Sequence, residues 1–321
     1  MRWAPRFGEA STAVSKRGER PVVVDVHAHV IVPGLGAEVV WDERGQVVRH
    51  GGREIRSALR EFQDVGRILE EQDRAGVDVV VLAPWVNLCG VEVERQNEAL
   101  AALTGERVVA LGTVDLDRPE LLAELTRDGR LSGVEIPAAP GGDYLGHERF
   151  RDFWAAAAET GVLVFIHPSS RGFGLPVLEE HYLWNTVGNP VETAVTAAHM
   201  VGAGVMDDLP ELRVLLAHGG GVLPALRGRL AHEQTVHAPG RDVLAAIARF
   251  YVDTVVHDAA VLRGLVEFFG AERVLLGSDY PFDMGVDRPA DIVRALGLAP
   301  DDESAILGGN ALRLLRQESP A

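Results

Sequence analysis

Short apolar segments recur along this 321-residue chain, and a stretch with helical periodicity follows each of them. Such alternation favours a parallel sheet whose strands are joined by crossover helices. Eight strand candidates can be distinguished, which is the number of strands in a closed (β/α)₈ barrel. The predicted strands are Val22–Val26, Asp78–Ala83, Val108–Val114, Gly133–Ile136, Val162–Ile166, Arg213–Ala217, Phe250–Thr254 and Arg273–Gly277.

Helical patterns fill the intervals between these strands. The predicted helices are Asp64–Ala75, Arg95–Leu103, Pro119–Leu125, His147–Thr160, Val191–Val205, Leu223–Glu233, Asp258–Phe269, Arg288–Leu296 and Asp302–Leu315. A doubly wound open sheet is the alternative fold, but no Gly-rich dinucleotide fingerprint follows the first strand. We therefore predict the α/β class, with the architecture of a distorted (β/α)₈ TIM barrel.

Two long segments interrupt the alternation. The first, Val30–Gln63, is an insertion after the first strand, and we expect it to form a loop or small hairpin over the barrel mouth. The second, Ser169–Asn189, is predicted to be a loop. Residues 1–20 are polar, mixed in charge and without the apolar centre of a signal peptide, which is typical of a flexible tail. Residues 21–321 are expected to form one domain, because single barrels of this length are common.

Composition excludes several classes of partner. The net charge of −16 disfavours nucleic acid and anionic membranes. No run of about eighteen apolar residues is present, so no transmembrane helix is expected, and the cytoplasm is the expected compartment. The single cysteine, Cys89, leaves no disulfide framework and no cysteine-based zinc site.

Two histidines, His27 and His29, follow the first predicted strand and are separated by one residue. Residues i and i+2 of an extended chain point to the same face, so both imidazoles can be directed to one point. Nitrogen ligands arranged in this way are typical of sites for Zn²⁺ and similar divalent cations.

Further candidate ligands end other predicted strands: His167, His218 and Asp279. Catalytic residues of TIM barrels lie at the carboxyl ends of strands, and polar groups there are costly unless paired or metal-bound. Taken singly, each histidine is more often a satisfied core or surface residue, and Asp279 is also typical of a turn. Together they indicate a site of three histidines and one carboxylate for Zn²⁺, with Mn²⁺ or Fe²⁺ as alternatives. One histidine is then left as an acid or base.

Several segments carry a resemblance to a known family. They are Asp25–His29, Phe165–Pro168, Ala217–Gly221, Tyr251–Asp258, Leu276–Gly285 and Gly308–Ala311. On these segments, from about Val22 to Leu315, the chain resembles the amidohydrolase superfamily, in the branch of amino-carboxymuconate-semialdehyde decarboxylase. The His-x-His pair and the strand-end aspartate mark the superfamily. The His-Gly-Gly-Gly and Tyr-Val-Asp-x-x-x-His-Asp segments are more specific to this branch.

The resemblance implies a role for each site residue. His27, His29, His167 and Asp279 would hold one metal ion, and His218 would be the unliganded acid or base. Such an ion makes bound water acidic and stabilises negative charge on oxygen.

The resemblance also implies substrate-binding residues. Two arginines would hold substrate carboxylates: Arg56, eight residues before Asp64, and Arg229, which would reach in from the neighbouring subunit of a homodimer. Arg60 competes with Arg56 for this role. Trp184, in the second long loop, is a candidate for the pocket wall.

Three functions remain open on the sequence. The favoured one is decarboxylation of a small unsaturated or aromatic carboxylic acid. The alternative is a metal-dependent hydrolase of an amide, ester, thioester or lactone, and a barrel with a relict site is the non-enzyme alternative. The loops that shape the pocket diverge from the decarboxylase, and the segment Val134–Pro137 lacks the polar residues expected of it. The substrate therefore stays undefined.

Overall fold

A computed structural model describes residues 20–35, 38–42, 45–50, 53–55, 62–127, 129–169, 175–237 and 240–315. All eight predicted strands are present, and they form one parallel sheet that follows the order of the chain. These strands are β1 (Val24–Val30), β5 (Val79–Pro84), β6 (Val108–Gly112), β7 (Leu131–Pro137), β8 (Leu163–His167), β9 (Arg213–Leu216), β10 (Tyr251–Asp253) and β11 (Val274–Leu275).

The sheet closes on itself between β11 and β1. The backbone N–H of Val26 donates to the carbonyl of Leu276 at 2.9 Å, and that of His29 donates to Tyr280 at 2.8 Å. Ala28 and Tyr280 form a parallel bridge. The predicted barrel is confirmed, and the doubly wound sheet is excluded because its strand order would not follow the chain.

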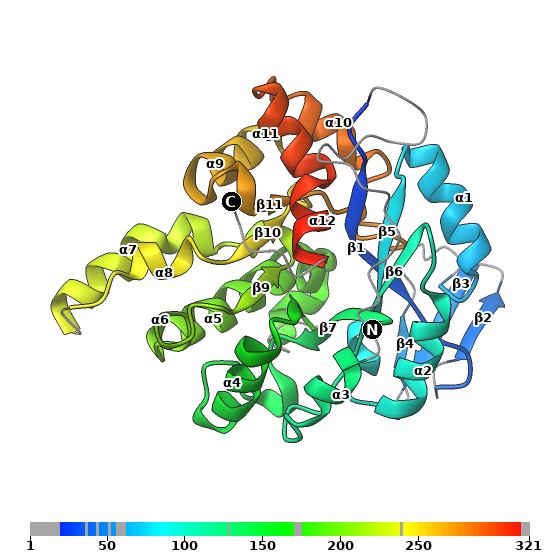
Figure 1. The fold of residues 1–321 in the computed structure, drawn as a ribbon, viewed down its shortest axis with the longest axis horizontal. Helices are drawn as coiled ribbons and strands as arrows, with labels where there is room; N and C mark the ends of the chain where they lie inside the picture. The colour runs from blue at the N-terminus through cyan, green and yellow to red at the C-terminus, as the bar shows by residue number, and fades with distance from the viewer. Residues whose placement is uncertain are drawn as a thin grey trace.

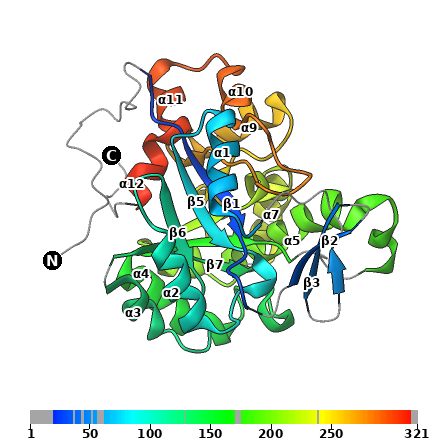
Figure 2. The ribbon, with the colours of Figure 1, turned by 90° about the vertical axis from the view of Figure 1, so that its right-hand side faces the viewer.

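Helices surround the barrel (Figures 1 and 2). They are α1 (Val65–Ala75), α2 (Val93–Leu103), α3 (Leu121–Arg127), α4 (Arg151–Thr160), α5 (Asn189–Gly202), α6 (Val205–Asp208), α7 (Leu223–His237), α8 (Val243–Ile247), α9 (Ala259–Phe269), α10 (Pro289–Arg294), α11 (Pro300–Ser304) and α12 (Asn310–Leu315). The last predicted helix is divided by a π-helical turn, Ala305–Gly309. Among the residues described, no helix is long and apolar enough to cross a membrane.

Local sequence signals set the ends of α1. The side chain of Asp64 accepts a hydrogen bond from the backbone N–H of Arg67 at 3.1 Å and caps the first turn. Gly76 ends the helix at φ 80°, a left-handed conformation that glycine adopts without strain. Ile68 and Gln72 are the buried residues of this helix.

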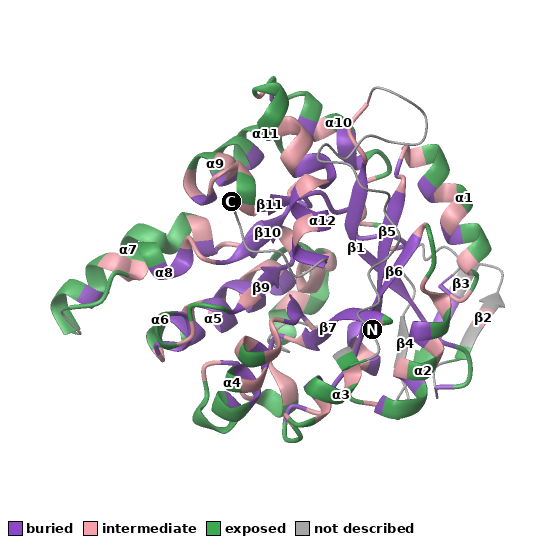
Figure 3. Ribbon diagram, viewed as in Figure 1, coloured by how far each residue is buried: buried purple, intermediate pink, exposed green. Residues whose placement is uncertain are grey.

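The core has two layers, and Figure 3 shows the buried strands enclosed by helices with exposed outer faces. Inside the barrel, side chains such as Val81, Phe165 and Leu215 form one cluster, which Leu312 and Leu315 of α12 join. A second cluster lies between the strands and the surrounding helices. Helix α12 therefore covers part of the barrel interior.

An irregularity in β1 positions the histidine pair. Val26 packs in the barrel interior, whereas Ala28 packs outside in a cluster shared with α1. Regular alternation would place both on one face, but the pairing of β1 with β5 shifts register between Asp25 and Ala28. This shift turns His27 and His29 into the barrel. The strand thus continues through both histidines instead of ending before them.

The two long segments are more regular than predicted. The insertion contains a three-stranded antiparallel sheet rather than a loop or single hairpin: β2 (Glu38–Asp42), β3 (Gly45–His50) and β4 (Arg53–Ile55). Within the second segment, residues 175–188 form the short helical turns η4 (Pro176–Tyr182) and η5 (Trp184–Gly188), the latter a π-helix. Residues 1–19 of the predicted tail lie outside the described residues, while Arg20 makes an ion pair with Asp78 at 2.7 Å.

Candidate metal centre

Four side chains converge at the carboxyl ends of three strands. One ligand atom from each of His27, His29, His167 and Asp279 lies within 4.8 Å of the others, and all four residues are buried. The first two come from β1, the third is the last residue of β8, and Asp279 follows β11. The structure therefore brings together the four residues that the sequence singles out as ligands.

The geometry fits a cation. Nε2 of His27 lies 3.1 Å from Nε2 of His29 and 3.2 Å from Oδ1 of Asp279. Nε2 of His167 is buried and has no hydrogen-bond partner among the described residues. Since a buried polar atom without a partner is costly, this nitrogen fits a role as a ligand of a metal ion.

The charge states suit a metal ligand set. Burial and the neighbouring imidazoles lower the pKa of His167 well below its ordinary value, so this ring is neutral. Its Nδ1 lies 2.8 Å from the carbonyl oxygen of Pro168, which leaves Nε2 free to coordinate. Burial alone would raise the pKa of Asp279, but the surrounding histidines, His27 foremost, hold it well below its usual range. His167 and Asp279 thus offer a neutral nitrogen and an anionic oxygen.

Two further buried carboxylates support the histidine pair, and the sequence did not identify either. Asp253, the last residue of β10, places Oδ2 2.6 Å from Nδ1 of His27. Glu135 of β7 places Oε2 3.5 Å from Nδ1 of His29. Carboxylates behind metal-binding imidazoles fix the ring orientation and raise the basicity of the coordinating nitrogen.

Glu135 corrects the expectation for the fourth barrel strand. We expected Val134–Pro137 to lack polar site residues, and that was wrong. Val134 and Ile136 pack outward among the helices. Alternation therefore directs Glu135, which is fully buried, into the barrel beside His29.

His218 lies beside the four-residue group but outside it. Its Nε2 is 3.4 Å from Oδ2 of Asp279. The backbone N–H groups of His218 and Gly219 donate to Asp253 at 3.0 and 2.9 Å. One carboxylate thus holds both the His218 turn and the ring of His27, so the two histidines keep a fixed relation.

A cavity of about 250 Å³ opens next to this centre. His218 and Asp279 line it together with Asn185, Thr186, His257 and Met284. Its size is at the small end for ligand pockets. The arrangement can therefore bind a small molecule against a cation and an adjacent imidazole.

The amidohydrolase family model matches residues 24–317. This chain belongs to the amidohydrolase family. The match covers the whole barrel and includes every residue of the centre.

Individual relatives are similar over nearly their whole length. The 2-amino-3-carboxymuconate-6-semialdehyde decarboxylase of Dictyostelium discoideum is 28% identical over 92% of each chain. The 2,6-dihydroxybenzoate decarboxylase from Rhizobium has a TM-score of 0.76 at 22% identity, covering 92% of this chain and 99% of that one. A dihydroxybenzoic acid decarboxylase from Polaromonas sp. JS666, solved with manganese and the inhibitor 2-nitroresorcinol, has a TM-score of 0.72 at 20% identity, covering 92% and 97%. At these identities the structural matches show a shared fold.

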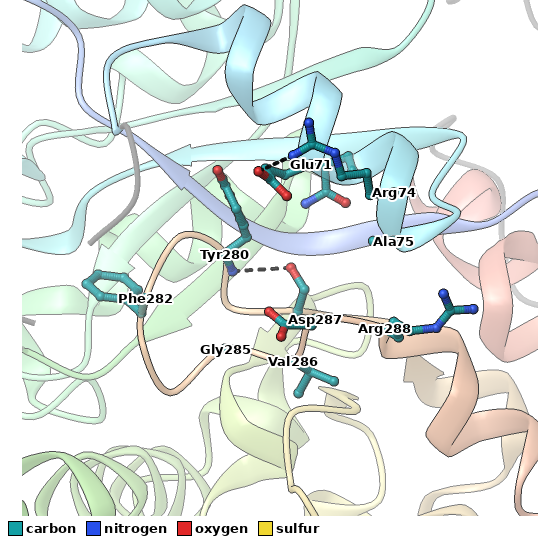
Figure 4. A pocket seen from close by; sticks show the side chains of 11 residues that line it. Glu71, Arg74, Ala75, Tyr280, Phe282, Gly285, Val286, Asp287 and Arg288 are labelled. Carbon is teal, nitrogen blue, oxygen red and sulfur yellow. Dashed lines mark hydrogen bonds and ion pairs between the residues drawn. The ribbon is translucent and has the colours of Figure 1, made fainter. Parts of the chain in front are cut away.

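This amidohydrolase has a second, larger cavity of about 370 Å³ between α1 and the segment after β11 (Figure 4). None of the four candidate ligands lines it. Two of its charged side chains, Glu71 and Arg74, already pair with each other at 2.5 Å. The smaller cavity is therefore the one that adjoins Asp279 of the candidate ligands and His218.

The remaining residues that the sequence predicts for the site do not belong to the four-residue group. Arg56 and Arg60 lie outside the described residues. Arg229 is exposed on α7, which extends away from the barrel in Figure 1. Trp184 packs its ring against Tyr182 with centroids 4.9 Å apart, and it is the two residues after it that line the cavity.

Proposed function

We propose that this amidohydrolase is a metal-dependent decarboxylase that removes CO₂ without oxidation from a small unsaturated or aromatic carboxylic acid. The observation that carries the proposal is the position of His218. It lies 3.4 Å from Asp279, outside the ligand set, and faces the cavity. A proton donor beside a cation site is what replacement of a carboxylate by hydrogen requires.

The relatives support the same class of reaction. The Dictyostelium discoideum relative is named as a decarboxylase of a carboxymuconate semialdehyde, and two structural neighbours are named as decarboxylases of dihydroxybenzoic acids. Decarboxylation is therefore favoured over hydrolysis of an amide, ester, thioester or lactone, which the same groups could also catalyse.

Different residues of the chain would bind the metal ion and deliver the proton. His27, His29, His167 and Asp279 would hold the ion, whose positive charge stabilises anionic oxygen when it is bound. As the bond between the substrate carbon and its carboxylate breaks, CO₂ leaves and the electron pair stays on that carbon. His218 delivers the proton that this carbon takes up.

For the metal we propose Zn²⁺, because three imidazoles and one carboxylate suit it. The donor set also suits Mn²⁺, which one structural neighbour contains, and Fe²⁺.

We also propose a cytoplasmic homodimer in which Arg229 reaches the neighbouring cavity. Exposed apolar side chains near this arginine on α7, Leu226 at 43% and Val236 at 59%, support a protein contact there. Arg56, with Arg60 as its competitor, is proposed to bind the substrate carboxylate, and Trp184 to border the pocket.

The variant His218→Ala tests the proposal. We expect it to bind metal and to remain folded, because neither the ligand set nor Asp253 is altered. CO₂ release should fall by about 10²–10⁴-fold, the usual contribution of a positioned proton donor. Metal content by elemental analysis and thermal melting serve as controls. Unchanged turnover would contradict the role of His218.

A further inference from the structure

Backbone strain is concentrated around the candidate substrate cavity. Among the described residues, six non-glycine residues have positive φ, and three of them line this cavity: His218 (φ 56°), His257 (φ 56°) and Asp279 (φ 60°). A left-handed conformation is less favourable for a residue with a Cβ than for glycine, although Asn, Asp and His adopt it more often than other such residues. It persists where the surroundings impose it, often at functional sites. Two of the three already have roles, which leaves His257 to be explained.

Two carboxylates fix the turn that carries His257. On one side, Asp253 accepts the backbone N–H of Val255 at 3.0 Å, in addition to its bonds to the His218 turn. On the other side, Asp258 accepts the N–H groups of Ala260 and Val261 and caps α9. His257 is held between these anchors, so its backbone position is fixed relative to His218.

The wall of this cavity has an apolar part and a polar part. Val255, Val256 and Met284 give it apolar surface suited to the faces of a ring or a conjugated chain. Asn185 and Thr186, from the π-helix η5, add an amide and a hydroxyl. Among the described lining residues there is no lysine or arginine. Apart from His218, His257 is the one histidine among the described lining residues, and as an exposed residue its side chain is accessible to a ligand.

We propose that His257 is a specificity residue whose imidazole donates a hydrogen bond to a second hydroxyl or carboxylate of the substrate, separate from the carboxylate that leaves. This inference rests on the proposed function and narrows it. The substrate class becomes unsaturated or aromatic acids that carry a second polar substituent, rather than simple monocarboxylates.

The left-handed backbone at His257 allows the side chain to be removed without destabilising the fold. His257→Gly removes the imidazole and relieves the strain, so this variant should melt at or above the wild-type temperature. His257→Asn keeps a residue that tolerates this conformation and retains a donor. Glu92→Gly is the matched control, because Glu92 also has positive φ (41°) but lies at the start of α2 and does not line the cavity.

Binding is measured by calorimetry on metal-loaded protein with two pairs of probes: isophthalate against benzoate, and 2,6-dihydroxybenzoate against 2-hydroxybenzoate. We expect the wild type to prefer the acid with the additional group in at least one pair. His257→Gly should weaken binding of that acid by about tenfold or more and leave its partner unchanged. His257→Asn should retain part of the preference, and Glu92→Gly all of it.

Three results would overturn the inference: no preference in the wild type, an unchanged preference in His257→Gly, or equal weakening of both acids of a pair. The proposed function is judged separately by CO₂ release from a panel of unsaturated and aromatic carboxylates that includes the same acids. If no acid is decarboxylated, the proposed function fails, while the binding comparison still decides the role of His257.

Discussion

Asp253 connects a candidate metal ligand to the turn that carries His218. Its carboxylate contacts Nδ1 of His27 and accepts backbone N–H groups from His218, Gly219 and Val255. Burial alone would raise its pKa, but the charge of His27 and these hydrogen bonds lower it, so the group stays ionised. One buried anion thereby sets the ring of a candidate metal ligand and the backbone of the candidate proton donor.

Glu135 is the carboxylate beside His29, with Oε2 3.5 Å from Nδ1 of that ring, and this leads to a prediction at the residue scale. Glu135→Gln keeps the size of the side chain but removes the negative charge behind the ring. We expect metal affinity, measured by chelator competition, to fall by about 10–100-fold. Glu94→Gln, a substitution at a side chain that is 76% exposed, serves as the matched control and should bind metal as the wild type does. Equal affinities of Glu135→Gln and the wild type would show that the carboxylate does not act on the site.

The candidate ligands and His218 were predictable from sequence as candidate site residues, whereas the supporting carboxylates were missed. His167, His218 and Asp279 stand at the ends of apolar strands, where a polar residue is conspicuous. Asp253 carries the same signal at the end of its strand. Glu135 lies inside a strand, so only the inward-facing alternation of β7 could have revealed it.

At the scale of elements, β1 shows that the alternation of side chains along a strand does not by itself predict which face points into the barrel. The histidine pair was correctly expected on one face, since His27 and His29 are two residues apart. The face itself depends on the register shift before Ala28, which arises from pairing with β5 and has no local sequence signal. The three-stranded sheet of the insertion likewise depends on cross-strand pairing, such as Val39 opposite Val48.

Helix α5 is joined to the end of β8 through Glu192, which is 2% exposed. Its carboxylate accepts the backbone N–H of Ser169 at 2.7 Å, two residues after His167. Burial raises the pKa of Glu192, although the bonds from Ser169 oppose the shift. The segment that follows a candidate ligand is therefore held by a carboxyl group that folding makes harder to ionise.

This shift predicts a pH dependence of stability. Because the folded pKa of Glu192 is raised, its favourable contribution is present at low pH and is lost as the pH rises through that pKa. The side chain of Glu192→Gln cannot ionise, so this variant does not lose that stability as the pH rises. Melting temperatures measured from about pH 4 to pH 8 should thus show the wild type losing stability relative to the variant as the pH rises. A constant difference between the two proteins over this range would rule the linkage out.

For the whole molecule, the class, the number of strands and their order followed from the alternation of eight apolar strands with helices. A parallel barrel leaves little freedom once each strand is joined to its neighbour by a crossover. The oligomeric state does not follow from this pattern. Nothing in the barrel pattern specifies how α7 meets another copy, so the homodimer with a crossing Arg229 stays a prediction.

The central claim concerns the reaction, and the change in product mass tests it most directly. Metal-loaded protein is incubated with a panel of unsaturated and aromatic carboxylates, amides, esters, thioesters and lactones, with His218→Ala as the control. We predict that a carboxylate loses the mass of CO₂ and that the variant slows this loss by about 10²–10⁴-fold. A gain of water with bond cleavage, and no loss of CO₂ from any acid, would contradict the account and identify the protein as a hydrolase.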